Sequence, residues 1–291
     1  MTTRIISATV GLFLLFAVVF LRHTLVFPIV LGLLVCIILY ELAKAVDALE
    51  HRLSLAGSFL CGFLTILCTF WSQAYDNSGI VTPMSVAIPY AVLNAAEQLL
   101  MPLFLLLTFI DFVWHHKNFK IEQLGCIIAS TFLVPWSLAH LIPLGLSEHG
   151  ILYMIMALGG AWIADSGAYF SGIALGKHKL CPNISPKKTI EGFVGGLVCN
   201  AVVFSLVFLI CAYIQGLPFG LLNGCKGACL GLCCAGVSVL GDLAASVIKR
   251  EKNIKDYGNI MPGHGGMMDR FDSALFVIPM FYLFVTTFPI I

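Results

Sequence analysis

Residues 193–214 read FVGGLVCNAVVFSLVFLICAYI, a stretch that contains no Asp, Glu, Lys or Arg. A helix of about 20 apolar residues is long enough to cross the roughly 30 Å hydrocarbon layer of a membrane. The pattern therefore predicts a membrane-spanning helix. Similar stretches occur on both sides of it in the chain.

The apolar stretches form a series that begins near the N-terminus. They cover residues 5–21, 25–40, 53–71, 99–114, 124–141, 151–175, 193–214, 227–247 and 273–291, and a less certain segment at 85–96 precedes the fourth. We find no internal repeat and no linker. The sequence predicts an all-α, polytopic integral membrane protein with about nine transmembrane helices and a single membrane domain over residues 1–291.

Composition agrees with this prediction. The chain has 291 residues, of which 59% are hydrophobic and 11% charged, whereas about 25% are charged in an average soluble protein. A soluble domain of this size needs far more polar surface. The net charge of +1 leaves no basic stripe for nucleic acid, so no nucleic-acid partner is expected.

The basic residues predict the orientation, because cytoplasmic loops retain Lys and Arg. With nine spans and a cytoplasmic N-terminus, 14 of the 16 basic residues fall on the inner side, all except Arg22 and Lys226. The two longest polar loops then face the cytoplasm. Nine charged side chains lie in residues 249–272 and six in residues 165–191. These two segments are the candidate sites of chemistry.

The eleven cysteines lie almost entirely in apolar stretches. Cys225, Cys229 and Cys233 recur every four residues and could share a helix face, but no CxxC pair occurs. Cysteine in a packed or lipid-facing helix usually behaves as a small hydrophobe. We favour that interpretation over a metal or redox site.

The first polar segment begins at Asp165 in ADSGAYFSGIALGK. A carboxylate at that depth is costly and indicates pairing, ion binding or transport. Helical spacing places Tyr169, Gly172 and Gly176 on the same helix face as Asp165. The alternative to a binding role for this face is that its glycines only allow close helix packing. Then SPKKTIEG (residues 185–192) places two lysines, a hydroxyl and an expected tight turn before a helix expected near Glu191. Ammonium groups and a helix N-terminus favour phosphate, although a topology-setting basic loop is the alternative.

The second polar segment, with the end of the eighth span that leads into it, carries a further set of polar side chains. Asp242, Ser246 and Lys249 fall at i, i+4 and i+7 on one helix face, and Asp269 and Asp272 open the last span at i and i+3. Aspartates at a membrane surface suit a hard divalent cation such as magnesium. The alternative is a set of surface ion pairs with nearby Arg250, Lys255 and Arg270.

The second segment resembles a known family hallmark. Ser246-x-x-Lys249-Arg250, then Lys255-Asp256, then the turn Pro262-Gly-His264-Gly-Gly, and Asp269-Arg270-x-Asp272 are similar to the CDP-diacylglycerol synthase, or phosphatidate cytidylyltransferase, family. ADSGAYFSG, GKHKL and SPKKTIEGFVGG resemble its second conserved block. The detailed resemblance covers about residues 158–273. It departs at Met261, where the family has Leu, Ile or Phe.

The resemblance implies transfer of CMP from CTP to phosphatidic acid in the bilayer, for phospholipid biosynthesis, with Mg²⁺ as cofactor. A second, monovalent cation and a homodimer are left open. It implies N-terminal transmembrane helices over residues 1–150 and catalytic helices and cytoplasmic loops over 151–291. It further implies a multi-pass protein of the inner (cytoplasmic) membrane with its active site on the cytoplasmic face.

The resemblance also assigns roles to matching residues. It implies catalytic roles for Asp242, Lys249, Arg250, Asp269 and Asp272, metal binding by Asp242, Asp269 and Asp272, and substrate binding by Asp165, Ser185, Lys187, Lys188, Ser246, Lys255, His264 and Arg270. The nucleophile would be the lipid phosphate itself, so no catalytic triad is needed.

Two other classes of protein remain as alternatives. A CTP-dependent lipid kinase or a prenyl-lipid cytidylyltransferase would use the same metal and phosphate groups with a different lipid. A transporter would also carry acidic residues near its spans, as Glu97 and Asp111 do. Transporters often show repeated halves with broken helices, and we find neither.

Overall fold

The computed structural model describes residues 2–76, 90–215, 220–261, 263 and 265–288. The chain packs as two compact units. The first combines Met1–Ile151 with Lys252–Arg270, and the second combines Leu152–Glu251 with Phe271–Ile291. The second polar segment of the sequence is thus divided between the units, since its loop belongs to the first and Asp272 to the second.

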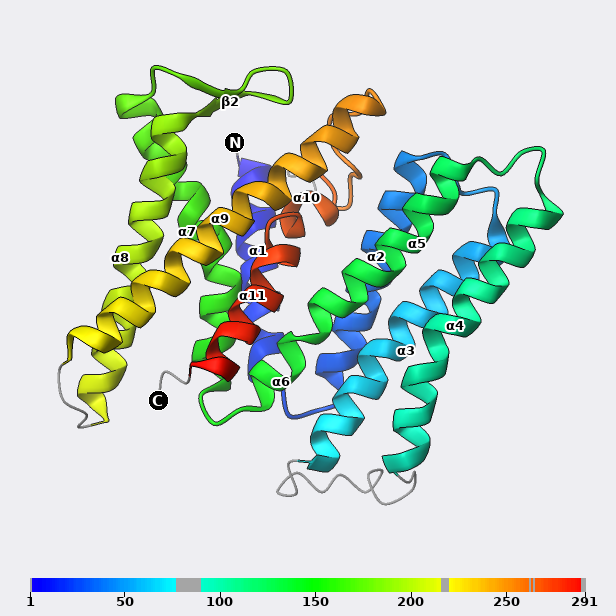
Figure 1. The fold of residues 1–291 in the computed structure, drawn as a ribbon, viewed down its shortest axis with the longest axis horizontal. Coiled ribbons are helices and arrows are strands. Elements are labelled where there is room, and N and C mark those ends of the chain that lie inside the picture. Colours follow the sequence, from blue (N-terminus) through cyan, green and yellow to red (C-terminus); the bar gives the residue numbers. More distant parts are fainter. Residues whose placement is uncertain (1, 77–89, 216–219, 262, 264, 289–291) are drawn as a thin grey trace. The chain divides into compact units, whose positions relative to one another are not determined.

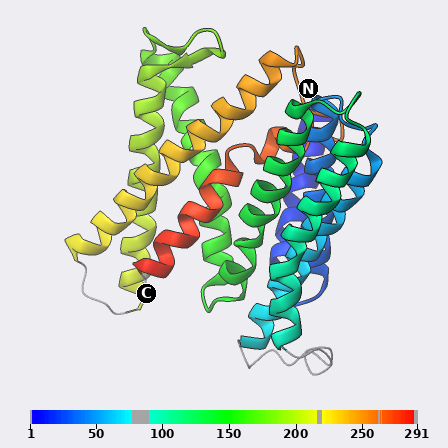
Figure 2. The ribbon, with the colours of Figure 1, turned by 45° about the vertical axis from the view of Figure 1, so that its right-hand side comes forward.

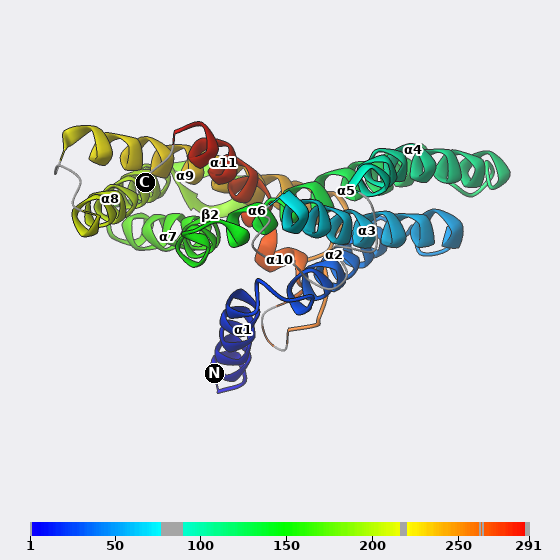
Figure 3. The same cartoon turned by 90° about the horizontal axis from the view of Figure 1, so that it is seen from below.

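The first unit is helical (Figure 1). It contains α1 (Thr2–Phe20), α2 (Val26–Ala45), α3 (Arg52–Asp76), α4 (Tyr90–Trp114), α5 (Ile121–Ala139) and α6 (Leu141–Leu146). Helix α3 packs against α2, α4 and α5. Helix α1 contacts α2, and Figure 3 shows it set apart from α3, α4 and α5. The core at one end of these helices contains Ala43, Val46, Ala48, Leu55, Cys61, Phe104, Phe119, Leu124 and Ile127.

The second unit combines long helices with a small hairpin. It contains nearly all of α7 (Gly150–Leu175), then β1 (Lys179–Cys181), β2 (Ser185–Thr189), α8 (Ile190–Ile214), α9 (Leu221–Glu251) and α11 (Ala274–Thr287). Helix α9 packs along both α8 and α11, as Figures 1 and 2 show. The short α10 (Met268–Phe271) precedes α11 in the chain.

Helix α8 shows why the apolar stretch at 193–214 folds as it does. One face is buried and carries Gly192, Gly196, Asn200, Phe204, Phe208 and Ala212. The other carries large apolar side chains every four residues that are at least half exposed, namely Val194, Val198, Val202, Leu206 and Ile210. A helix that is apolar all round is expected to face protein on one side and lipid on the other.

Glycines let α7 and α8 approach closely. A Cβ atom at Gly196 would lie 2.7 Å from the Ala164 carbonyl oxygen, and one at Gly172 would lie 3.6 Å from the Gly192 Cα. A Cβ at Gly176 would meet the Thr189 hydroxyl at 2.9 Å. The glycines predicted to share a face with Asp165 therefore pack against the start of α8. This agrees with helix packing, which the sequence left as the alternative to a binding role for that face.

The prediction of an all-α membrane protein is confirmed. Eight described helices are long and apolar enough to cross a membrane, and the β1–β2 hairpin is the only sheet in the described residues. The count of about nine spans and the cytoplasmic N-terminus stay predictions. In the uncertain segment at 85–96, α4 begins at Tyr90, while the preceding residues lie outside the described part of the chain.

Candidate active site

The hairpin presents the predicted phosphate-binding lysines. Strands β1 and β2 are antiparallel, with Lys179 opposite Thr189 and Cys181 opposite Ser185. The turn lies at residues 182–184, so the SPKK stretch is itself extended rather than a tight turn. Alternate residues of a strand point to opposite faces, and accordingly Lys187 is exposed whereas Lys188 is half-buried.

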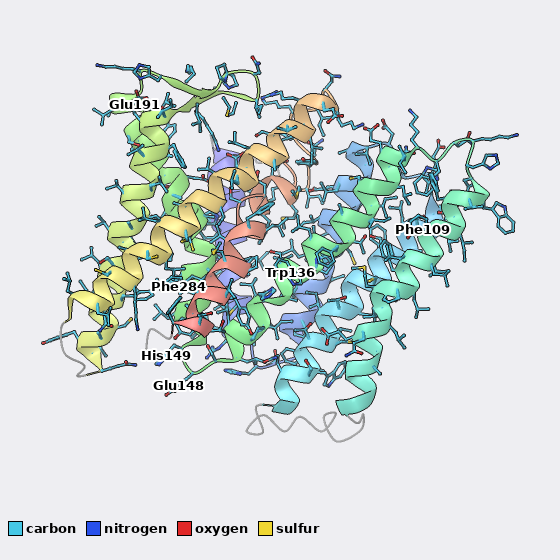
Figure 4. All side chains as sticks on the ribbon, in the orientation of Figure 1. Phe109, Trp136, Glu148, His149, Glu191 and Phe284 are labelled. Atoms are coloured by element: carbon cyan, nitrogen blue, oxygen red, sulfur yellow. The ribbon has the colours of Figure 1, made fainter. Side chains whose placement is uncertain are left out.

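The junction of the hairpin with α8 is held by two polar side chains. The Thr189 hydroxyl caps α8 by accepting a hydrogen bond from Gly192 N at 3.1 Å. Glu191, labelled at the hairpin end of α8 in Figure 4, accepts from Lys177 N at 3.1 Å and from His178 N at 3.2 Å. The helix predicted near Glu191 is confirmed and begins at Ile190.

Lys188 reaches from the hairpin to α9. Its ammonium nitrogen lies 2.5 Å from Asp242 Oδ2, an ion pair whose angles fall outside hydrogen-bond geometry. Asp242 Oδ1 accepts a hydrogen bond from the Ser246 hydroxyl at 3.3 Å. One carboxylate thus contacts a cation on one oxygen and a hydroxyl donor on the other. This pairing joins the first polar segment of the sequence to the acidic face of α9 within the second unit.

Helix α9 ends in positive charge. Lys249 and Arg250 occupy its last turn, where cations are favoured by the partial negative charge of the helix C-terminus. Arg250 Nε donates to the Ile184 carbonyl at 3.2 Å. The hairpin turn is therefore held against the end of α9.

Three carboxylates gather in the second unit. Asp165 on α7, Asp242 on α9 and Asp272 before α11 are close enough to interact electrostatically, and so are Lys188 with Asp165 and Lys249 with Asp272. Asp272 is buried and accepts a hydrogen bond from Ser273 N at 2.7 Å. Like charges repel unless cations lie among them, so this cluster requires positive charge.

The chemistry of these oxygen donors fits magnesium. In the described residues, no group of three or more His, Cys, Asp and Glu side chains is arranged to hold a metal ion. Magnesium typically takes one or two protein carboxylates and completes its shell with waters and substrate phosphates. The Lys188 ammonium on Asp242 shows that this carboxylate already accepts a cation.

The remaining predicted residues belong to the first unit. Asp269 Oδ2 accepts hydrogen bonds from Tyr257 N at 2.8 Å and Gly266 N at 3.0 Å. Lys255 and Arg270 are exposed, and His264 lies outside the described residues. The structure thus brings Asp165, Ser185, Lys187, Lys188, Asp242, Ser246, Lys249, Arg250 and Asp272 into one unit. The metal role shared by Asp242 and Asp269 stays a prediction.

Sequence reasoning missed a buried acid that contacts the loop Lys252–Arg270, which carries most of the family hallmark and is called the signature loop below. Glu41 on α2 is 1% exposed, and it accepts hydrogen bonds from Met267 N at 3.0 Å and Met268 N at 2.7 Å. Its position near the end of an apolar span was a usable signal, because a carboxylate there is costly. The same rule had identified Asp165.

A second missed network stabilises the first unit. Asp111, also 1% exposed, accepts from Ser54 N at 2.9 Å and from the Ser54 hydroxyl at 2.5 Å, and lies 2.7 Å from His115 Nδ1. Gln123 donates to the carbonyl oxygens of Val46 and Asp47. Asp111 is therefore a buried acid whose carboxylate is held by hydrogen bonds from Ser54 and by His115.

Comparisons with known proteins extend over the whole chain. The sequence model of the Cytidylyltransferase family matches residues 2–288. The phosphatidate cytidylyltransferase of Bacillus subtilis is 38% identical over 197 residues, 67% of this chain and 70% of the relative. The protein of the same name from Haemophilus influenzae is 29% identical over 287 residues, 97% of each chain. The one from Aquifex aeolicus is 38% identical over 189 residues, 65% of this chain and 66% of the relative. This chain therefore belongs to the cytidylyltransferase family.

Proposed function

We propose that this protein is a phosphatidate cytidylyltransferase, which transfers CMP from CTP to phosphatidic acid and forms CDP-diacylglycerol and pyrophosphate. The observation that carries the proposal is the ion pair between Lys188 and Asp242. It joins the lysine-bearing hairpin to the acidic helix. This contact supports a site in which Lys188 would bind phosphate and Asp242 would bind a cation, as a reaction between CTP and a phospholipid requires.

The reaction needs charge compensation more than it needs a protein nucleophile. An oxygen of the lipid phosphate attacks the α-phosphorus of CTP and forms a new P–O bond. The bond from the α-phosphorus to the oxygen that bridges to the β-phosphorus breaks, and its electron pair leaves with pyrophosphate. Both reactants are anions, so fixed positive groups lower the barrier by stabilising the charge that spreads over the transferring phosphorus.

The basic side chains of the second unit supply that positive charge. Lys187, Lys188 and Ser185 on β2 would contact the CTP phosphates or the phosphatidate head group. Lys249 and Arg250 at the end of α9 would neutralise further phosphate oxygens. Arginine suits this role because its planar fork pairs with two phosphate oxygens at once.

Magnesium is the proposed cofactor. Asp242, Asp269 and Asp272 would hold it, and Ser246 would orient Asp242 through its hydrogen bond. When bound, the ion withdraws charge from phosphate oxygens and assists departure of pyrophosphate. A monovalent cation beside it remains an open alternative.

We place the site on the cytoplasmic face of the inner membrane. The hairpin and the Lys252–Arg270 loop are rich in basic residues, as cytoplasmic loops are. There CTP would come from water and phosphatidic acid from the adjacent leaflet. A homodimer stays a prediction.

A product assay tests the activity. The purified protein is incubated with labelled CTP, phosphatidic acid and Mg²⁺, and its products are identified by mass spectrometry. We expect CDP-diacylglycerol from the wild type and from Glu148→Ala, which removes an exposed carboxylate elsewhere in the first unit (labelled in Figure 4). Asp269→Ala should lose more than about 100-fold in rate, because a metal ligand contributes several kcal/mol of charge stabilisation.

Three outcomes would contradict the proposal. A folded wild type that forms no CDP-lipid removes the activity. A phosphorylated lipid or a CDP-prenol in place of CDP-diacylglycerol would assign a different substrate class. Full activity in Asp269→Ala would remove the proposed metal ligand.

A further inference from the structure

Three consecutive backbone amides of the signature loop are held by two carboxylates. Gly266 N donates to Asp269 Oδ2 at 3.0 Å, Met267 N donates to Glu41 Oε1 at 3.0 Å, and Met268 N donates to Glu41 Oε2 at 2.7 Å. Hydrogen bonds to an ionised acceptor are stronger than those between neutral groups. Glu41 and Asp269 therefore hold adjacent peptide groups of the same turn.

The loop backbone packs directly onto the Glu41 carboxylate. A Cβ atom added at Gly258 would lie 2.2 Å from Glu41 Oε1, and one at Gly266 would lie 2.6 Å from both oxygens. Real Cβ atoms do not approach other atoms so closely, so a side chain at Gly258 would displace the Glu41 carboxylate, and one at Gly266 would also meet Gly258 N at 2.6 Å. The absence of side chains at these two glycines thus lets the loop backbone lie against Glu41 of α2.

The contact also closes the loop on itself. Asp269 Oδ2 bonds Tyr257 N as well as Gly266 N, which ties the beginning of the turn to its end. Since Glu41 holds the two amides that follow Gly266, it restrains the backbone that leads into Asp269. Its own carboxylate is buried in the first unit at 1% exposure.

We infer that Glu41 is a positioning residue of the active site, which orients Asp269 for magnesium by anchoring the amides of Met267 and Met268. The inference rests on the proposed function, in which Asp269 is a metal ligand. Residues that orient a metal ligand are typically worth 10–100-fold in metal affinity or activity.

The test compares two buried acids of the same unit in the full-length protein in detergent. Glu41→Gln keeps the shape of the side chain but turns an amide donor toward the loop. Asp111→Asn makes the same change at an acid with the same 1% exposure, whose hydrogen bonds go to Ser54 and His115. Ser54→Ala is a milder control that removes one donor to Asp111.

Three quantities are measured for each variant. They are the Mn²⁺ dissociation constant by electron paramagnetic resonance, the Mg²⁺ concentration for half-maximal rate, and the thermal unfolding midpoint. We expect Glu41→Gln to weaken Mn²⁺ binding about 10-fold and to raise the half-saturating Mg²⁺ similarly. Asp111→Asn and Ser54→Ala should lower the unfolding midpoint and leave both metal constants unchanged.

Hydrogen exchange provides a measurement that does not depend on activity. Amides of Met267 and Met268 should exchange faster in Glu41→Gln than in Asp111→Asn, since only the first variant changes their acceptors. If Glu41→Gln does not fold, Glu41→Asp replaces it. Glu41→Asp keeps the charge, but its side chain is shorter by one methylene. It should change Mn²⁺ binding and amide exchange in the same direction as Glu41→Gln, by a smaller amount.

The outcomes separate this inference from the proposed function. A Glu41→Gln variant that loses stability but binds Mn²⁺ like the wild type overturns the positioning role, provided that Asp269→Asn weakens Mn²⁺ binding. Unchanged Mn²⁺ binding in Asp269→Asn overturns the metal role of Asp269 and the inference with it. If the wild type is inactive but Glu41→Gln still weakens Mn²⁺ binding and speeds amide exchange, only the proposed reaction is overturned, and the positioning role of Glu41 stands.

Discussion

The ammonium group of Lys188 lies 2.5 Å from a carboxylate oxygen of Asp242. The two residues come from β2 and α9, and their opposite charges form an ion pair. In the proposed function, a magnesium ion would bind Asp242 and a phosphate would bind Lys188, and each would compete with this ion pair. We therefore expect the pair to link metal binding to substrate binding.

Lys188→Gln tests that coupling. Without the competing ammonium, Asp242 should bind Mn²⁺ more tightly in the absence of substrate. The kcat/KM of Lys188→Gln for CTP should nevertheless fall about 10-fold to 100-fold, because the variant loses a charge-assisted contact between Lys188 and phosphate that is worth about 1.5–3 kcal/mol. Lys179→Gln, an exposed lysine of β1, should change neither constant. Weaker Mn²⁺ binding in Lys188→Gln would argue against competition.

Removal of divalent metal should stop the reaction. We expect EDTA to abolish formation of CDP-diacylglycerol and added Mg²⁺ to restore it, because the carboxylate cluster and the phosphates need a cation between them. The measurement is the initial rate against free Mg²⁺ concentration. A rate that persists in EDTA would show that Lys and Arg alone provide the charge compensation.

The cap of α8 should contribute measurably to stability. Thr189→Ala removes the acceptor for Gly192 N and should cost about 1 kcal/mol, which corresponds to a fall of about 2–4 °C in Tm for a chain of this size. Thr189→Ser keeps the hydroxyl and should restore most of the loss. Equal Tm values for the two variants would mean that the methyl group, rather than the cap, stabilises this junction.

The close approach of α7 and α8 should make Gly196 intolerant of a side chain. In Gly196→Ala the new Cβ would meet the Ala164 carbonyl oxygen at 2.7 Å, and overpacking of this kind costs about 1–3 kcal/mol. Gly236→Ala on α9 is the matched control, because its Cβ would meet nothing within 4 Å. Thermal unfolding should show a lower Tm for the first variant and an unchanged or higher one for the second.

Membrane orientation can be tested with two exposed loop positions. Asn183→Cys in the hairpin turn should react with a membrane-impermeant thiol reagent from the cytoplasmic side, and Glu148→Cys from the opposite side. Both residues are exposed, and Cys181→Ser serves as background because Cys181 lies in the hairpin. Labelling of both positions from the same side would contradict the predicted nine-span topology.

Much of the fold followed from hydropathy. A lipid-exposed segment must satisfy its backbone hydrogen bonds within itself. An apolar stretch such as 193–214 is therefore expected to form a helix. The β1–β2 hairpin was not predicted. Its strands are short, and polar residues such as Lys187 and Lys188 show no apolar alternation that would indicate a strand.

The acidic and basic candidates were also found in the sequence, because charge is costly in an apolar chain and therefore conspicuous. Spacing along one helix placed Ser246 beside Asp242, and the structure has their hydrogen bond. Such local relations depend only on the helical period of 3.6 residues.

The sequence by itself determined the helices, their apolar faces and the identity of the chemical groups. Only the tertiary structure decided that Lys188 pairs with Asp242, and that Glu41 holds amides 226 and 227 residues further along the chain. Helix periodicity says which residues share a face. It does not say which faces meet, because that depends on how whole helices pack and where glycines allow their backbones to approach.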